Sequence, residues 1–505
     1  MHLKIARNDI KWLFYYSVIA YLAVIFFYET GFVSSFNFLA FSVIIGAFGI
    51  FLEKKQKNYT MPFILVIIGF LFALALRIIP YIGNPVPLGY DPGFYKYVFE
   101  NPFGGAWIKG MYPLGFVVIM HILSYVFTSE ILITYFFAVL SASTIFAVYF
   151  AVKKMFSKRV AVIAALIYPL SIAQLQTFWF NYYKNVIGII LLLVSYTFFK
   201  EKKRFNYEII IIGTIIAMFH RPALFIFGTS FVIYSLIYYK DKKKALLYIG
   251  LIAALGLLVN IDRITTYMLP GLAGLGNSII DLGGGAGTFF SIKNYFYYML
   301  AFIPFAIIGA SKSLDKNHGF LIGAIITFLT VILGLFFHNR LIIYLDIFVI
   351  VYSAIGFDIL IREKKKFGMT ILISFIIIFA VIAAIKSTGL KPLISSSEFK
   401  EIQSFNSIIP KDSYIMSTSS YYTPWLKGYV NRGVIAPGMF NLNKMNKKDW
   451  QTFWVGINRT NYLNMYKKTI YIYVGERQVP MNFDSDCFNL IINKTGKLYE
   501  YICGK

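Results

Sequence analysis

Apolar segments long enough to cross a lipid bilayer recur along most of this 505-residue chain. A helix needs about 17–25 mainly apolar residues to cross about 30 Å of hydrocarbon. The segments of a membrane β-barrel would instead alternate between apolar and polar residues, and these segments do not alternate. Only 14% of the residues are charged, compared with about 25% in soluble domains. The sequence therefore predicts an all-α polytopic membrane protein with about 13 transmembrane helices.

The basic residues between the segments predict their orientation, because loops rich in Lys and Arg face the cytoplasm. Lys4, Arg7 and Lys11 place the N-terminus in the cytoplasm. Basic loops then alternate with loops poor in Lys and Arg, except around 112–127, which we expect to be a re-entrant or interfacial helix of a large outside loop, 80–130. The predicted transmembrane domain covers 1–386, with spans near 12–28, 38–52, 61–79, 131–152, 160–177, 185–199, 207–219, 223–239, 245–260, 294–311, 319–337, 340–361 and 368–386.

The remainder of the chain, 387–505, is polar and of mixed composition. Thirteen spans from a cytoplasmic N-terminus place it outside the cytoplasm. Short β-like runs separated by Gly, Asn and Pro indicate a small α/β domain. Cys487 and Cys503 are the two cysteines of the chain, and a disulfide between them is expected in an extracytoplasmic domain. The β-like runs are 413–417, 429–435, 469–474 and 488–492.

The formal net charge of +25 raises the question of a nucleic-acid partner. The Lys and Arg residues stand in short clusters between apolar segments, which is typical of topology signals and of contact with anionic lipids. We therefore expect the lipid bilayer of the cell membrane, and no nucleic acid, among the partners.

Asp91 is the first candidate for chemistry, because it follows the third predicted span in an aromatic-rich stretch of the outside loop. A partly desolvated carboxylate of raised pKa suits a general base acting on a hydroxyl. The alternative is that Asp91 is a turn or helix N-cap residue, because Asp-Pro-Gly is strong turn chemistry.

A set of basic side chains falls at predicted outside turns or span ends, so that they could converge on one face. Such a set suits a lipid-linked phosphate or diphosphate, with Arg giving bidentate contacts. The alternative is that each one snorkels to lipid head groups. The short outside turns that carry two of the arginines argue against this, because the positive-inside bias disfavours them there. The candidates for binding the phosphate of such a lipid-linked donor substrate are Arg77, Lys184, His220, Arg221 and Arg340.

A glycine-rich outside loop, 262–293, could fold over a bound substrate. It is not a phosphate-binding P-loop, because no Gly-Lys-Ser/Thr follows. The five histidines are scattered without a metal-binding motif, so no cofactor is predicted. A divalent cation held by Asp91 with Asp262 and Asp281 stays open as an alternative that no motif supports.

Taken together, these features resemble the GT-C superfamily of glycosyltransferases, which use polyprenyl (dolichyl-type) phosphate donors. The resemblance implies a GT-C-like membrane domain, with Asp91 as the base that deprotonates the acceptor hydroxyl. It also implies that Arg221 and Arg340, with Lys184 and His220, hold the phosphate of the leaving group, and that transfer inverts the anomeric carbon. The acceptor would be an extracytoplasmic lipid-linked glycan or a protein. The stretches that carry the resemblance are Arg77, 90–95, 112–115, 178–185, 220–222 and 339–340.

The sequence also departs from the patterns of the superfamily. The Trp-Trp-Asp motif of oligosaccharyltransferase catalytic subunits is absent, and Lys184 stands where their second acidic motif is expected. Pro92 follows Asp91, whereas protein mannosyltransferases and aminoarabinose transferases carry an Asp-Glu pair. The missing Trp-Trp-Asp motif and the presence of Lys184 argue against transfer of a whole oligosaccharide to protein.

Two other functions remain as alternatives. One is a transporter or flippase for lipid-linked saccharides, which predicts charges near the middle of the bilayer. Asp346 is the best candidate for such a charge. The other is a non-catalytic assembly subunit, which would not need Asp91.

Overall fold

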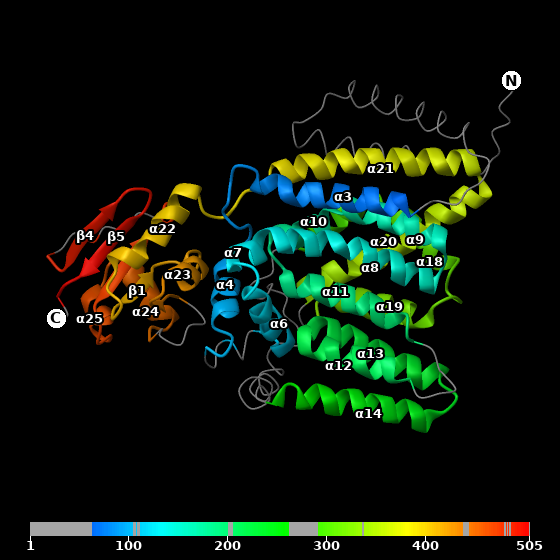
Figure 1. The fold of residues 1–505 in the computed structure, drawn as a ribbon, viewed down its shortest axis with the longest axis horizontal. Helices are drawn as coiled ribbons and strands as arrows, with labels where there is room; N and C mark the ends of the chain where they lie inside the picture. Colours follow the sequence, from blue (N-terminus) through cyan, green and yellow to red (C-terminus); the bar gives the residue numbers. More distant parts are fainter. Residues whose placement is uncertain are drawn as a thin grey trace, which may run out of the picture.

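The computed structural model describes residues 63–104, 108, 112–199, 206–261, 291–335, 338–437, 444–478, 481, 483 and 486–503. Figure 1 shows the membrane helices side by side in a bundle, with a small domain built on a sheet at one end. The predicted spans 12–28 and 38–52 and most of the glycine-rich loop 262–293 lie outside the described residues.

Every predicted span from 61–79 onward coincides with a helix or a bent pair of helices. Within the described residues, five helices are long and apolar enough to cross a membrane, or seven if each of two bent pairs counts as one crossing. The protein is therefore a mainly helical multi-pass membrane protein. The bundle consists of α3 (Ile64–Ile78), η1 (Ile79–Tyr81), α8 (Phe137–Met155), α9 (Lys158–Ile167), η3 (Tyr168–Leu170), α10 (Ile172–Trp179), α11 (Tyr183–Tyr196), α12 (Tyr207–Phe219), α13 (Arg221–Tyr238), α14 (Lys242–Leu258), α17 (Ile292–Met299), α18 (Ile303–Ser311), α19 (His318–Ile332), α20 (His338–Glu363) and α21 (Lys365–Thr388).

Helix α20 runs through the middle of the bundle and is buried along most of its length. It packs closely on α18, where a Cβ on Gly309 would lie 1.9 Å from the carbonyl oxygen of Tyr352. A Cβ on Gly356 would likewise lie 2.1 Å from the carbonyl oxygen of Phe305. Small residues allow helices to approach this closely in a membrane, so the two glycines fix the position of α20.

The span that begins with α9 is broken at Ser171, where η3 ends and α10 turns away by 54°. Asp346 of α20 is fully buried at this break. Its carboxylate accepts hydrogen bonds from Ser171 Oγ at 2.8 Å and from Gln174 Nε2 at 2.7 Å. Asp346, the candidate for a mid-membrane transport charge, therefore holds the bent helix in place.

Three short helical segments lie between the bundle and the C-terminal domain (Figure 1). They are α4 (Pro92–Glu100), α6 (Leu114–Ser124) and α7 (Ser129–Ile131), and a π-helical turn, η2 (Leu132–Phe136), follows. The 11 residues of α6 rise by only about 16 Å, so this helix is too short to cross about 30 Å of hydrocarbon.

The C-terminal domain has a five-stranded sheet in the order β2-β1-β3-β5-β4. β2, β1 and β3 are parallel, whereas β5 runs antiparallel to both β3 and β4. Cys487 and Cys503 form a disulfide beside the β4–β5 hairpin, with Cα atoms 4.8 Å apart. The small α/β domain predicted from the sequence is thus present, with bounds β1 (Tyr414–Ser417), β2 (Gly433–Ile435), β3 (Ile470–Val474), β4 (Phe488–Asn493) and β5 (Lys497–Tyr501).

Helices cover both faces of this sheet. Alternate side chains of β3 point to opposite sides, so Tyr471 and Tyr473 pack with α22 (Ser396–Ile408) and α23 (Thr423–Tyr429). Ile470, Ile472 and Val474 pack on the other side with α24 (Lys447–Trp454) and α25 (Arg459–Asn464). A strand covered on both faces is a continuous apolar run, which explains the sequence of β3.

The C-terminal domain docks on α4 through α23. A Cβ on Gly93 would lie 1.9 Å from the carbonyl oxygen of Pro424, and one on Gly428 would lie 2.1 Å from the carbonyl oxygen of Gly93. The hydroxyl of Tyr90 donates to the carbonyl oxygen of Ser420 at 2.6 Å. Because Tyr90 and Gly93 flank Asp91, this docking fixes the segment that carries the candidate base.

We predict that Gly428→Ala separates α23 from α4. The added methyl group would overlap backbone atoms, which cannot rotate away, so the expected cost is about 1–3 kcal/mol. The unfolding midpoint of the purified protein measures this cost. Gly250→Ala in α14 is the control, because a Cβ there meets nothing within 4 Å. Equal midpoints for the two variants would contradict the proposed docking contact.

Candidate active site

Asp91 occupies the N-cap position of α4, with Pro92 at the first helical position, but its side chain makes no capping hydrogen bond. The turn prediction therefore describes its backbone and leaves its carboxylate available. The residue is partly exposed. Burial raises the pKa of the Asp91 carboxyl above its ordinary value, while the charges of Lys184 and Arg340 act in the opposite direction.

The backbone before Asp91 is held by the turn between α10 and α11. Gly89 has φ +82°, and a Cβ on it would lie 2.7 Å from the carbonyl carbon and oxygen of Phe180. Asn181, itself left-handed at φ 57°, donates from its side-chain amide to the carbonyl oxygens of Leu88 at 3.3 Å and Ile133 at 3.2 Å. This turn therefore ties the loop that carries Asp91 to the start of the helix that carries Lys184.

Three basic side chains come together near Asp91 from the ends of three helices. Lys184 lies in the first turn of α11, Arg221 begins α13 and Arg340 lies in the first turn of α20. Lys184 interacts electrostatically with Asp91, Arg340 and Arg221. All three are partly exposed, and the ammonium of Lys184 lies 4.3 Å from the ring centre of Tyr112.

His220 completes the cluster from the N-cap position of α13. Its Nδ1 accepts the backbone N–H of Ala223 at 3.3 Å and lies 2.7 Å from the hydroxyl of Tyr344. A backbone N–H can only donate, so the proton of the neutral ring is on Nε2. Burial, reinforced by the neighbouring cations, holds the pKa of His220 below its ordinary value, so the ring is neutral and Nε2–H is a donor.

Arg77 does not join this cluster. It is buried between helices of the bundle, where its Nε donates to Ser141 Oγ at 2.8 Å and its Nη1 to the carbonyl oxygen of Ala73 at 2.9 Å. Its guanidinium also interacts with Tyr168. The outer end of α3 thus carries a cation that links helices, and we leave Arg77 out of the proposed site.

Tyr344 was not predicted from the sequence, although a signal for it exists. It lies four residues after Arg340, on the same face of α20. Gly188 of α11 makes room for it, because a Cβ there would lie 2.5 Å from the Tyr344 hydroxyl and 2.9 Å from Nδ1 of His220.

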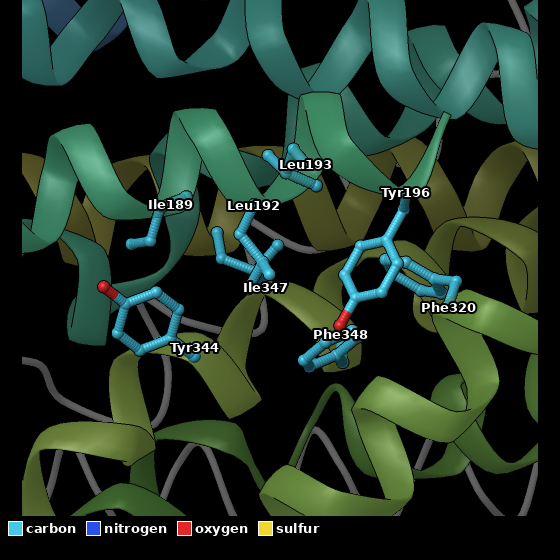
Figure 2. A pocket seen from close by; sticks show the side chains of 8 residues that line it. All are labelled: Ile189, Leu192, Leu193, Tyr196, Phe320, Tyr344, Ile347 and Phe348. Atoms are coloured by element: carbon cyan, nitrogen blue, oxygen red, sulfur yellow. The ribbon is translucent and has the colours of Figure 1, made fainter. Parts of the chain in front are cut away.

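A small cavity lies between α11, α19 and α20 (Figure 2). Tyr344 and Tyr196 lie at its opposite ends in this view. Its lining carries no ionisable group other than these tyrosines and is fully buried, so we assign the cavity to the packing behind the cluster. The lining residues are Ile189, Leu192, Leu193, Tyr196, Phe320, Tyr344, Ile347 and Phe348.

In the part of the chain that the structure describes, no group of three or more His, Cys, Asp or Glu side chains could hold a metal ion. Among the described residues, Lys184 and Arg340 supply positive charge that acts on Asp91.

The arrangement of this protein is found in two enzymes of solved structure. The apo oligosaccharyltransferase of Archaeoglobus fulgidus matches with a TM-score of 0.61 at 15% identity, over 81% of this chain and 69% of that chain. Apo ArnT from Cupriavidus metallidurans matches with a TM-score of 0.58 at 10% identity, over 87% and 97%. The same two proteins match in complex with an inhibitory peptide and a dolichol-phosphate, and with undecaprenyl phosphate, respectively.

The chain therefore has the fold of these two proteins, as its resemblance to the GT-C superfamily predicted. The chain belongs to the EpsG family, whose profile matches residues 70–395. No curated protein matches the chain in sequence. The family match covers the whole cluster around Asp91 and ends before the sheet of the C-terminal domain.

We predict that Gly188→Ala displaces the ring of His220. The added methyl group would overlap the Tyr344–His220 pair, so the hydrogen bond from the Ala223 amide should break. Hydrogen exchange at the start of α13 should then become faster. Gly228→Ala, further along α13, is the control because a Cβ there meets nothing within 4 Å. Unchanged exchange at Ala223 in Gly188→Ala would refute this prediction.

Proposed function

We propose that this protein is an inverting glycosyltransferase that moves a sugar from a polyprenyl or dolichyl phosphate to an extracytoplasmic acceptor. The observation that carries the proposal is the carboxylate of Asp91, which interacts with Lys184 and Arg340, with Arg221 beside Lys184. Three cations against one carboxylate leave excess positive charge, which suits a phosphate leaving group.

In the proposed reaction, Asp91 accepts the proton of the acceptor hydroxyl. The acceptor oxygen forms a bond to the anomeric carbon, and the bond from that carbon to the phosphate oxygen breaks. The electron pair leaves with the polyprenyl phosphate, whose negative charge Arg221, Arg340 and Lys184 stabilise. His220 adds the neutral Nε2–H donor.

The proposed inversion is what the resemblance to the GT-C superfamily implies, and the carboxylates of the described residues fit it. A retaining enzyme normally uses a second carboxylate as nucleophile, whereas in the described residues Asp91 is the acidic group that acts on Lys184. A single displacement, with the acceptor attacking opposite the leaving phosphate, needs only one base.

The donor and the side of the membrane are part of the same proposal. Dolichol-phosphate and undecaprenyl phosphate are bound by the oligosaccharyltransferase and ArnT structures that share this fold. The basic loops predicted to be cytoplasmic, such as the one at Lys153 and Lys154, lie at the opposite ends of the helices from Lys184. We therefore assign the cluster and the C-terminal domain to the extracytoplasmic side of the cell membrane, where the acceptor is a lipid-linked glycan or a protein.

The first test replaces the base. Asp91→Asn keeps the shape of the side chain but removes the proton acceptor, and loss of a general base costs about 10²–10⁴-fold in rate. The assay is transfer of radiolabelled sugar from membrane lipids by the purified protein, and the unfolding midpoint checks that the variant is folded. Wild-type turnover by Asp91→Asn would eliminate the catalytic role of Asp91.

The second test follows the pH dependence of transfer. The base must be ionised, and burial raises the pKa of Asp91, so kcat/KM should fall on acidification at a pH above the ordinary carboxyl pKa of about 3.9. Lys184 favours the ionised form of Asp91. Lys184→Met should therefore move this acid limb to higher pH.

The control for that shift is Lys153→Met in the last turn of α8. It should leave the acid limb where it is in the wild type. An acid limb that stays in place in Lys184→Met, or moves to lower pH, would show that Asp91 is not the titrating group.

A further inference from the structure

Asn185 follows Lys184 in the first turn of α11, and its side chain carries an unsatisfied donor. The residue is 6% exposed, and its amide nitrogen has no hydrogen-bond partner among the described residues. Buried polar groups are almost always paired, because leaving a donor without a partner is costly. An orphan amide in this position calls for an explanation.

The face of α11 that carries Asn185 is turned toward the cluster. Gly188 lies one turn further on, and a Cβ on it would overlap the Tyr344 hydroxyl and Nδ1 of His220. The Tyr344 hydroxyl also lies 3.5 Å from the carbonyl oxygen of Asn185. Residues three apart share one face of a helix, so the side chain of Asn185 lies on the face that meets His220.

The groups around that face are donors. His220 offers Nε2–H, and Lys184 offers its ammonium from the neighbouring position on α11. Arg221 and Arg340 interact electrostatically with both of these residues. A ligand held by such a set must bring acceptor oxygens, and a further N–H donor fits the same ligand.

We propose that Asn185 contacts the bound donor substrate, its side-chain N–H donating a hydrogen bond to an oxygen of the lipid-linked phosphate. This inference rests on the proposed function, because it takes the phosphate of the donor as the ligand of the cluster. The cost of the orphan amide in the free protein is then recovered when the phosphate binds.

The test measures binding of undecaprenyl phosphate to the full-length protein in nanodiscs. A hydrogen bond to a charged group corresponds to about tenfold or more in affinity, so Asn185→Ala should raise the Kd by at least that factor. Asn185→Asp should abolish binding, because it places a carboxylate against the phosphate. The unfolding midpoint without ligand should not fall in Asn185→Ala, since the amide nitrogen has no partner in the protein to lose.

Asn206→Ala is the matched control. Asn206 is also fully buried, but it lies before α12, at the other end of the helix from His220, and donates to the carbonyl oxygen of Phe198 at 3.3 Å. This variant should lower the unfolding midpoint and leave the Kd unchanged.

The outcomes separate the two proposals. If the wild type binds undecaprenyl phosphate and Asn185→Ala binds it equally well, the role of Asn185 is refuted and the proposed function stands. If Asn185→Ala lowers the unfolding midpoint without changing the Kd, Asn185 is structural and the inference fails. If neither the wild type nor Arg340→Ala binds undecaprenyl phosphate, the assignment of a lipid-linked phosphate as the ligand of the cluster fails. The inference about Asn185 then fails with it.

Discussion

The proposed site depends on one electrostatic arrangement. The carboxylate of Asp91 interacts with Lys184 at the start of α11 and Arg340 at the start of α20, and Arg221 at the start of α13 lies beside Lys184. An isolated charge is costly to remove from water, and burial alone would drive Asp91 toward its protonated form. Lys184 and Arg340 oppose this, so the carboxylate can stay ionised in a partly desolvated place. That is the condition a general base needs, and the excess of cations is the condition a departing phosphate needs.

The rest of the fold keeps these charges in register. Gly309 and Gly356 allow α18 and α20 to pack closely, which fixes the helix that carries Arg340 and Tyr344. Asp346 of α20 accepts hydrogen bonds at the start of α10, the helix that precedes Lys184. On the other side, α23 of the C-terminal domain packs against α4 at Gly93. The C-terminal domain therefore has a mechanical role beside the site, because its docking fixes the loop that bears the base.

Much of this could be predicted from the sequence, for identifiable reasons. Apolar segments have a length set by the bilayer, so every predicted span from 61–79 onward coincides with a helix or a bent pair of helices, and five to seven of these are long and apolar enough to cross. Asp91 stood out as a carboxylate among aromatic residues in a large outside loop. Lys184, His220, Arg221 and Arg340 stood out as basic residues at outside turns or span ends. Arg77 was predicted to bind phosphate because it lies near the end of a span, but that position does not reveal whether its side chain turns inward. In the structure it contacts Ser141 and Tyr168 within the bundle. Tyr344 and Asn185 were missed because their significance comes from contacts between α11, α13 and α20, which no local pattern encodes.

A structure with a bound polyprenyl phosphate tests the central claim most directly. The account predicts phosphate oxygens in charge-assisted contact, at about 2.7–2.9 Å, with the guanidinium of Arg221 or Arg340, and the carboxylate of Asp91 facing the side opposite the phosphate. A phosphate bound more than about 6 Å from both guanidinium groups, too far for contacts of that kind, would contradict it.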